Sequence, residues 1–121
     1  MIYGLGIDIC DLKRVKKICQ KGNAFALKIL TNAEFEIYDH LVPQRQIEFL
    51  AGRFSAKEAY SKALGTGIGK NVSFKDLEII DDEKGAPHFT DHPYLKKLKA
   101  YISISHTTEY VVTEVILEER G

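Results

Sequence analysis

The fold of this chain is decided by the stretch Arg53-Phe54-Ser55-Ala56-Lys57-Glu58-Ala59-Tyr60-Ser61-Lys62-Ala63-Leu64-Gly65. It predicts the second half of a long helix, which Pro43 begins and Gly65 ends. On a helical wheel, one side of this helix is lined by Ile47, Leu50, Ala51, Phe54, Glu58 and Ser61. A carboxylate therefore interrupts the apolar side of a helix that otherwise belongs in a core.

Glu58 is the first candidate functional residue for this reason. An unpaired buried carboxylate is costly, so Glu58 needs a cation, a proton or a metal ion. Lys62 lies one turn further along, where its ammonium group can be that cation or can bind the same ligand as Glu58.

Composition limits the class of protein. The 121 residues suffice for one domain, residues 1–121, and 45% hydrophobic with 28% charged residues is typical of a soluble globular protein. Lysine plus arginine equals aspartate plus glutamate at 17 each, so no overall field favours nucleic acid or an anionic membrane. With no secretory signal and no membrane span, we expect a cytoplasmic protein in which Cys10 and Cys19 are reduced thiols.

The pattern of the whole chain predicts an α+β fold, with an antiparallel sheet packed against one long and several short helices. The other predicted elements are a strand over 2–9, a helix capped by Asp11 that runs to about Lys21, a short helix opened by a capping box at 31–34, strands over 77–80 and 87–90 around a turn at 82–85, and a hairpin of 100–106 and 109–118.

Asp8 is the second candidate. Period-two alternation places it on the strand face that carries Gly4 and Gly6, whereas the apolar residues Tyr3, Leu5, Ile7 and Ile9 share the other face. The two glycines leave either open space for a ligand or room for a helix to pack closely. If Asp8 meets Glu58, two carboxylates with Lys62 nearby suit magnesium, which takes water and phosphate oxygens as its other ligands.

The glycine-rich stretch Gly65-Thr66-Gly67-Ile68-Gly69-Lys70-Asn71 is not a P-loop, because it follows a helix and has Asn71 in the hydroxyl position. It is either a helix stop with a flexible loop or a loop whose backbone lies close to a ligand. Near the carboxyl end, Ser103-Ile104-Ser105-His106-Thr107 places His106 at a strand end, where it is either structural or part of a site. Ser105 and His106 point to opposite faces of the strand, which argues against a serine hydrolase.

Three stretches together resemble the signatures of the 4′-phosphopantetheinyl transferases. They are Gly6-Ile7-Asp8-Ile9, Phe54-Ser55-Ala56-Lys57-Glu58-Ala59 with Lys62, and Ser103-Ile104-Ser105-His106. The length and Lys62-Ala63-Leu64-Gly65-Thr66-Gly67 resemble the small subclass of holo-[acyl-carrier-protein] synthases. The resemblance implies transfer of 4′-phosphopantetheine from coenzyme A to a serine of apo acyl carrier protein, with magnesium, for fatty acid biosynthesis.

The resemblance also implies roles for individual residues. Asp8 and Glu58 would be the metal ligands, Lys62 would contact phosphate, and Gly65 with Thr66 would line the coenzyme A site. Ser105 and His106 would contact the nucleotide end from a neighbouring subunit of a homotrimer. Either Glu58 or a metal-bound water would take the serine proton.

Two further expectations follow from the resemblance. The carrier protein is acidic, and the predicted first helix carries basic residues to meet it, with Arg14 the preferred contact: Lys13, Arg14, Lys16, Lys17 and Lys21. Two-domain members of the family carry a second carboxylate at the position of Cys10, so a third protein ligand from that position is not expected here. The competing hypotheses are a non-catalytic carrier- or nucleotide-binding module and a magnesium-dependent nucleotide hydrolase.

Overall fold

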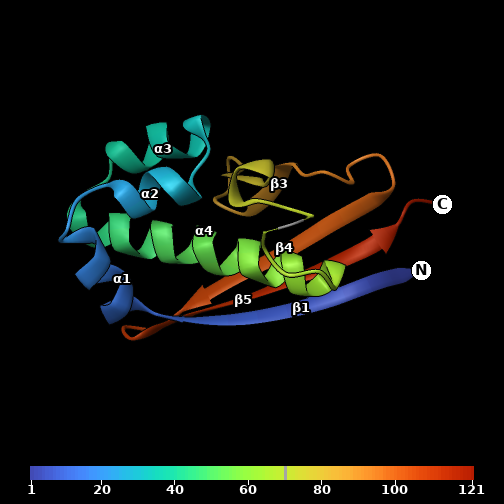
Figure 1. Ribbon diagram of the computed structural model, residues 1–121, viewed down its shortest axis with the longest axis horizontal. Coiled ribbons are helices and arrows are strands. Elements are labelled where there is room, and N and C mark those ends of the chain that lie inside the picture. Colours follow the sequence, from blue (N-terminus) through green and yellow to red (C-terminus); the bar gives the residue numbers. More distant parts are fainter. Residues whose placement is uncertain (70) are drawn as a thin grey trace.

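The computed structural model describes residues 1–69 and 71–121 and confirms the α+β class. In chain order the elements are β1 (Ile2–Asp11), α1 (Leu12–Cys19), α2 (Ala24–Ile29), α3 (Asn32–Asp39), α4 (Pro43–Leu64), the 3-10 turn η1 (Phe74–Asp76), β2 (Glu78–Asp81), β3 (Pro87–Asp91), β4 (Leu98–His106) and β5 (Tyr110–Glu119). The strands form an antiparallel sheet of order β1-β5-β4 and a separate β2-β3 ribbon. Helix α4 runs along the larger sheet, with α1, α2 and α3 around its amino-terminal half (Figure 1).

Most predicted boundaries are confirmed to within a residue or two. The Asp11 side chain caps α1 by accepting a hydrogen bond from the Lys13 amide, but the helix ends at Cys19 rather than near Lys21. Thr31 and Glu34 form the predicted capping box of α3, and Pro43 occupies the first turn of α4. Sequence patterning missed α2 and η1, each less than two turns long.

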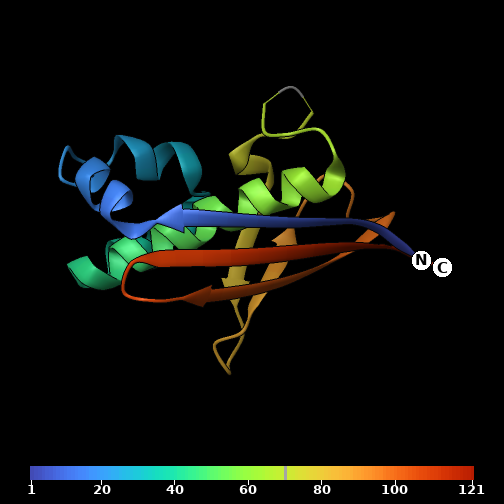
Figure 2. The same ribbon diagram turned by 90° about the horizontal axis from the view of Figure 1, so that it is seen from below.

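The glycine face of β1 is closed by a helix. Side views show β1 alongside α4 (Figure 2). A Cβ atom on Gly4 would overlap the carbonyl oxygen of Ala63, and one on Gly6 would overlap that of Ala59. Of the two alternatives for these glycines, close helix packing is therefore confirmed, and open space for a ligand is wrong.

The prediction that one side of α4 is buried is too simple. Beyond its first turn the helix is buried on nearly all sides, and the two least buried residues of the predicted side are Phe54 and Glu58. The buried charged residues are instead Lys57 and Arg53. The carboxylate of Glu58 thus lies at the edge of the core, not inside it.

A fully buried ion pair ties the helices to the second sheet. Lys57 Nζ lies 2.6 Å from Glu34 Oε1, both side chains are 0% exposed, and Lys57 also donates to the Ile29 carbonyl at 2.8 Å. Glu34 Oε2 accepts from the Ile79 amide at 2.8 Å. Burial lowers the pKa of Lys57, and the charge of Glu34 opposes that effect. The pair joins the end of α2, the start of α3, β2 and α4.

The outer face of β1 is apolar and uncovered by the rest of the chain. Tyr3, Leu5, Ile7 and Ile9 are 51–63% exposed, and Val112 of neighbouring β5 is 41% exposed. A contiguous apolar area of this kind on a sheet is typical of a surface that contacts another protein. Over the described residues, no helix combines the length and apolar character needed to cross a bilayer.

Close packing at Gly6 predicts a large penalty for adding one methyl group. Gly6→Ala should destabilise the protein by about 3 kcal/mol or more, because the obstacle is helix backbone that cannot move alone. Gly52→Ala is the matched control: its Cβ would lie 3.6 Å from Ile104 Cγ2, in ordinary contact, within a helix. It should be neutral or stabilise by up to about 1 kcal/mol. Urea unfolding at one protein concentration measures both, and equal stabilities would contradict this account of the β1–α4 contact.

Candidate active site

Asp8 and Glu58 lie together where the inner face of β1 meets α4. Both line a groove of about 270 Å³ that also includes Arg14 of α1 and Phe54 of α4. The predicted meeting of two carboxylates from different elements is therefore confirmed as geometry. Arg14 lines the same groove, and its role as a partner contact stays a prediction.

The Asp8 carboxylate is held at both oxygens. Lys62 Nζ lies 2.9 Å from Oδ1 and donates to the Ile7 carbonyl at 3.0 Å. Ser55 Oγ donates to Oδ2 at 2.8 Å and lies 2.8 Å from Thr113 Oγ1. Lys62 therefore forms its ion pair with Asp8 rather than with Glu58.

Glu58 carries an electrostatic penalty in this arrangement. Its pKa is raised above the ordinary glutamate value, first by burial and second by the negative charge of Asp8, and Lys62 only partly offsets this. Two like charges at one groove are stabilised when a cation lies between them. The site thus has the electrostatic character of a cation site.

A third acidic residue, Asp11, also lines the groove, but its carboxylate caps α1 by accepting a hydrogen bond from the Lys13 amide. Within the described residues, no cluster of three or more histidine, cysteine, aspartate or glutamate side chains could hold a metal ion. Burial, followed by the charge of Asp8, raises the pKa of Cys10 to about 11, so its thiol is protonated near neutral pH. Both cysteines are free, as expected.

The glycine-rich segment begins with the predicted helix stop. Gly65 takes a left-handed conformation with φ of 88°, and the Ser61 carbonyl accepts hydrogen bonds from the amides of Gly65 and Thr66 at 2.9 and 3.2 Å. Thr66 also lines a larger pocket of about 750 Å³ near the chain ends. Lys70, which belongs to the same predicted stretch, lies outside the described residues.

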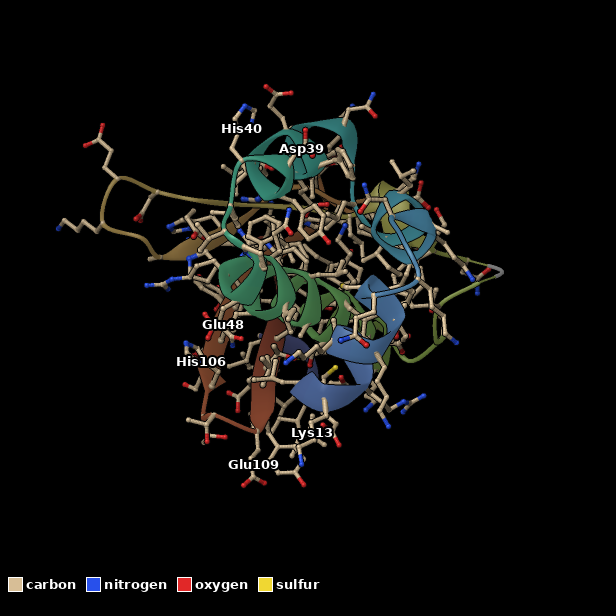
Figure 3. The ribbon with its side chains drawn as sticks, turned by 90° about the vertical axis from the view of Figure 1, so that its left-hand side faces the viewer. Lys13, Asp39, His40, Glu48, His106 and Glu109 are labelled. Atoms are coloured by element: carbon tan, nitrogen blue, oxygen red, sulfur yellow. The ribbon has the colours of Figure 1, made fainter. Side chains whose placement is uncertain are left out.

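His106 lies in a different groove of the same chain. It lines a hollow of about 390 Å³ together with Arg45, Phe49 and Arg53, none of which lines the Asp8–Glu58 groove. In Figure 3, His106 and Glu48 lie together near β4, whereas Lys13 of α1 lies apart from them, below α4 and close to Glu109. Ser105 is exposed on the outer face of β4, opposite to His106. One chain therefore does not bring these two residues to the carboxylates.

Sequence reasoning missed two residues of the carboxylate site. Ser55 precedes Glu58 by three positions and Lys62 by seven, and this spacing on one side of a helix could have identified it. Thr113 pairs directly with Asp8 across β1 and β5. Nothing in the sequence indicated that these two residues would be paired.

Comparison with known proteins identifies the family. Residues 4–115 match the model of the 4′-phosphopantetheinyl transferase superfamily. The chain belongs to this superfamily. Among curated phosphopantetheinyl transferases, it is 55% identical over 120 residues to the holo-[acyl-carrier-protein] synthase of Ligilactobacillus salivarius, covering 98% of this chain and 89% of the relative. The synthase of a Geobacillus species is 48% identical over 118 residues, covering 98% of each chain.

Solved structures of the superfamily share the fold. A holo-(acyl-carrier-protein) synthase from Bacillus anthracis in complex with CoA (3′,5′-ADP) matches with a TM-score of 0.89 and 45% identity over 99% of each chain. The Helicobacter pylori synthase in complex with coenzyme A matches with a TM-score of 0.81 and 31% identity, covering 94% of this chain and 99% of that one. These full-length likenesses place the chain among the synthase enzymes of the superfamily.

The penalty on Glu58 predicts a pH-dependent gain in stability for Glu58→Gln. Because the pKa of Glu58 is raised in the fold, the native protein binds this proton more tightly than the unfolded chain does. Its contribution to stability is therefore most favourable below the ordinary value of 4.5 and falls as pH rises through the raised pKa. At pH 7 without divalent cations, Glu58→Gln should exceed the wild type by roughly 0.5 kcal/mol, a value reduced for solvent screening.

Urea unfolding at pH 4 and pH 7 tests this expectation. The difference between Glu58→Gln and the wild type should grow with pH. Glu83→Gln, on the exposed β2–β3 turn, should show no such growth. A variant that is less stable than the wild type at pH 7 would mean that Glu58 is stabilised in the fold.

Proposed function

We propose that the chain transfers 4′-phosphopantetheine from coenzyme A to a serine of apo acyl carrier protein, in the cytoplasm and for fatty acid biosynthesis. The observation that carries the proposal is the pairing of Asp8 and Glu58 in one groove, with Lys62 bound to Asp8, in a chain that belongs to this superfamily. In the reaction, the serine oxygen attacks the phosphorus that bears the pantetheine arm. The bond to the leaving phosphate breaks, and 3′,5′-ADP departs.

The residues at the groove fit a magnesium ion. Mg²⁺ in proteins is usually bound by one or two carboxylates and completes its shell with water and substrate phosphates. This matches Asp8 and Glu58 in a groove where the described residues form no cluster of three possible metal ligands. Asp8 and Glu58 would hold the ion, which when bound supplies charge neutralisation for the pyrophosphate of coenzyme A.

Other groups of the site would position the coenzyme and move the proton. Lys62, whose side chain is 52% exposed, can move from Asp8 to a phosphate oxygen and balance the charge that develops on the leaving group. Either Glu58 or a metal-bound water would take the serine proton. The backbone at Gly65 and Thr66 would line the coenzyme site.

The carrier protein would dock against α1. The groove beside Asp8 and Glu58 has apolar walls from Val15, Ile18 and Phe25, and Arg14 stands at it. The other basic residues of this segment are exposed: Lys13, Lys16, Lys17 and Lys21. An acidic carrier protein can therefore bring its serine to the carboxylates while its charges meet the basic residues around α1.

The site would be completed by a second copy of the chain in a homotrimer. The exposed apolar face of β1 and β5 provides a surface for assembly. The hollow at His106 is also lined by Arg45 and Arg53, which pair with Glu48 and Asp81 at 3.8 and 3.0 Å, so its positive charges are already balanced within the chain. A heterologous contact between copies would place this hollow and Ser105 beside the neighbour's carboxylates, and threefold closure satisfies such a contact.

The proposed reaction predicts the mass of the modified carrier and the loss of rate in Glu58→Gln. Incubation with coenzyme A, Mg²⁺ and apo carrier should increase the intact mass of the carrier by one phosphopantetheine group. Glu58→Gln should reduce the rate about 100-fold, equivalent to about 3 kcal/mol for a preorganised electrostatic group, whereas Glu83→Gln should not change it. Near-wild-type transfer by Glu58→Gln at limiting Mg²⁺ would overturn the assignment of Glu58.

The same assay separates the competing functions. A binding module would bind coenzyme A and leave the mass of the carrier unchanged. A nucleotide hydrolase would release 3′,5′-ADP without carrier present. Either result would overturn the proposed transfer.

The shared site predicts complementation between two impaired variants. Glu58→Gln and His106→Ala subunits, dissociated, mixed in equal amounts and reassociated, should form about one interface in four with both residues intact. Activity should then rise well above that of either parent. Glu58→Gln mixed with Asp8→Ala is the control, because both changes lie on the same side of the interface and no healthy site can form. If native mass spectrometry shows mixed trimers and the first mixture stays at the parental level, the site does not cross an interface.

A further inference from the structure

Two buried hydroxyl groups lie behind the Asp8 carboxylate. Ser55 of α4 and Thr113 of β5 are both 0% exposed. Ser55 Oγ lies 2.8 Å from Asp8 Oδ2 and 2.8 Å from Thr113 Oγ1. The two hydroxyls and the carboxylate thus form a continuous chain of hydrogen bonds from the sheet, through the helix, to the site.

The direction of this chain follows from the number of protons. An ionised carboxylate only accepts hydrogen bonds, and a serine hydroxyl has one proton, so Ser55 gives its proton to Asp8. The bond between the two hydroxyls must then be donated by Thr113. Thr113 therefore orients the Ser55 hydroxyl toward Asp8, and each bond polarises the next.

The two partners of Asp8 differ in rigidity. Lys62 reaches Oδ1 with a long side chain that is 52% exposed. Ser55 reaches Oδ2 with a short side chain that the surrounding core immobilises. The rotation of the carboxylate is therefore fixed by Ser55, which leaves Oδ1 as the oxygen that can exchange Lys62 for another cation.

We propose that Ser55, oriented by Thr113, is a positioning residue that holds the Asp8 carboxylate in a cation-binding orientation. The inference rests on the proposed role of Asp8 as a metal ligand and adds the residues that prepare it. Mg²⁺ requires near-ideal octahedral geometry, so a carboxylate whose rotation is already fixed binds it with a smaller ordering cost. Hydrogen-bond partners of metal ligands usually change metal affinity by about 10- to 100-fold when they are removed.

Binding of Mn²⁺, followed by the loss of the free-ion signal in electron paramagnetic resonance, tests the proposal without measuring activity. The wild-type chain, Ser55→Ala, Thr113→Val and the double variant are titrated with Mn²⁺ alone. Ser55→Ala should weaken binding about 10-fold. Thr113→Val should weaken it about threefold, which is the effect expected from one neutral hydrogen bond. The double variant should bind like Ser55→Ala, because Thr113 acts only through Ser55.

The matched control is Thr90→Val. The Thr90 hydroxyl donates to a carboxylate oxygen of Glu78 at 3.0 Å in the other sheet, so the same chemical change is made away from Asp8. Its Mn²⁺ affinity should equal that of the wild type. Thermal unfolding of each variant shows whether a change in affinity accompanies a loss of fold, and if Ser55→Ala does not fold, Thr113→Val decides the test.

The outcomes separate this inference from the proposed function. If Asp8→Ala abolishes Mn²⁺ binding but folded Ser55→Ala and Thr113→Val bind like the wild type, the positioning role is overturned and the metal assignment stands. If the two single losses add in the double variant, Thr113 does not act through Ser55. If Asp8→Ala binds Mn²⁺ as tightly as the wild type, the metal assignment itself is overturned.

Discussion

The close approach of β1 to α4 determines the position of the site. Gly4 meets the backbone of Ala63 and Gly6 meets that of Ala59, so a step of two residues along the strand matches a step of four along the helix. The two steps have nearly equal lengths, about 6.7 Å in a strand and about 6 Å in a helix. Continuing the same register brings Asp8 to Ser55, the pair that the structure shows hydrogen-bonded at 2.8 Å. The strand and helix thus contact each other through their backbones at Gly4 and Gly6, and through side chains at Asp8, which binds Ser55.

The fold illustrates what local sequence can and cannot specify. Capping at Asp11 and Thr31, the proline at the start of α4 and the glycine at its end are local signals, and all of them are confirmed. Helix α2 was missed because its six residues carry no side-chain cap and too little periodic pattern. The role of Gly4 and Gly6 was left open because a missing side chain predicts ligand space and close packing equally well. Only the position of α4 distinguishes them.

The candidate site shows the same difference between signals within one element and contacts between elements. Asp8, Glu58 and Lys62 were found because each breaks a pattern or completes a motif in its own element. The partner of each charge was not found: Lys62 binds Asp8, and Lys57, a buried cation of α4, pairs with Glu34 from another helix. Ion pairs depend on which elements become neighbours, and sequence spacing within one helix cannot supply that. The functions of these residues remain predictions for the experiments above.

The Lys57–Glu34 pair also restricts how this sequence can change over time. Removing one partner would leave an uncompensated charge in a fully enclosed place, at a cost of about 3–5 kcal/mol, a large part of the stability of a small domain. Exchanging both for apolar residues would be tolerable for the pair itself, yet Glu34 also accepts the amide of Ile79. An evolutionary path away from the pair therefore needs coordinated substitutions at positions 23 residues apart, with a new partner for β2. A substitution at either position alone is therefore expected to destabilise the fold, which restricts change in the same helix that carries Glu58.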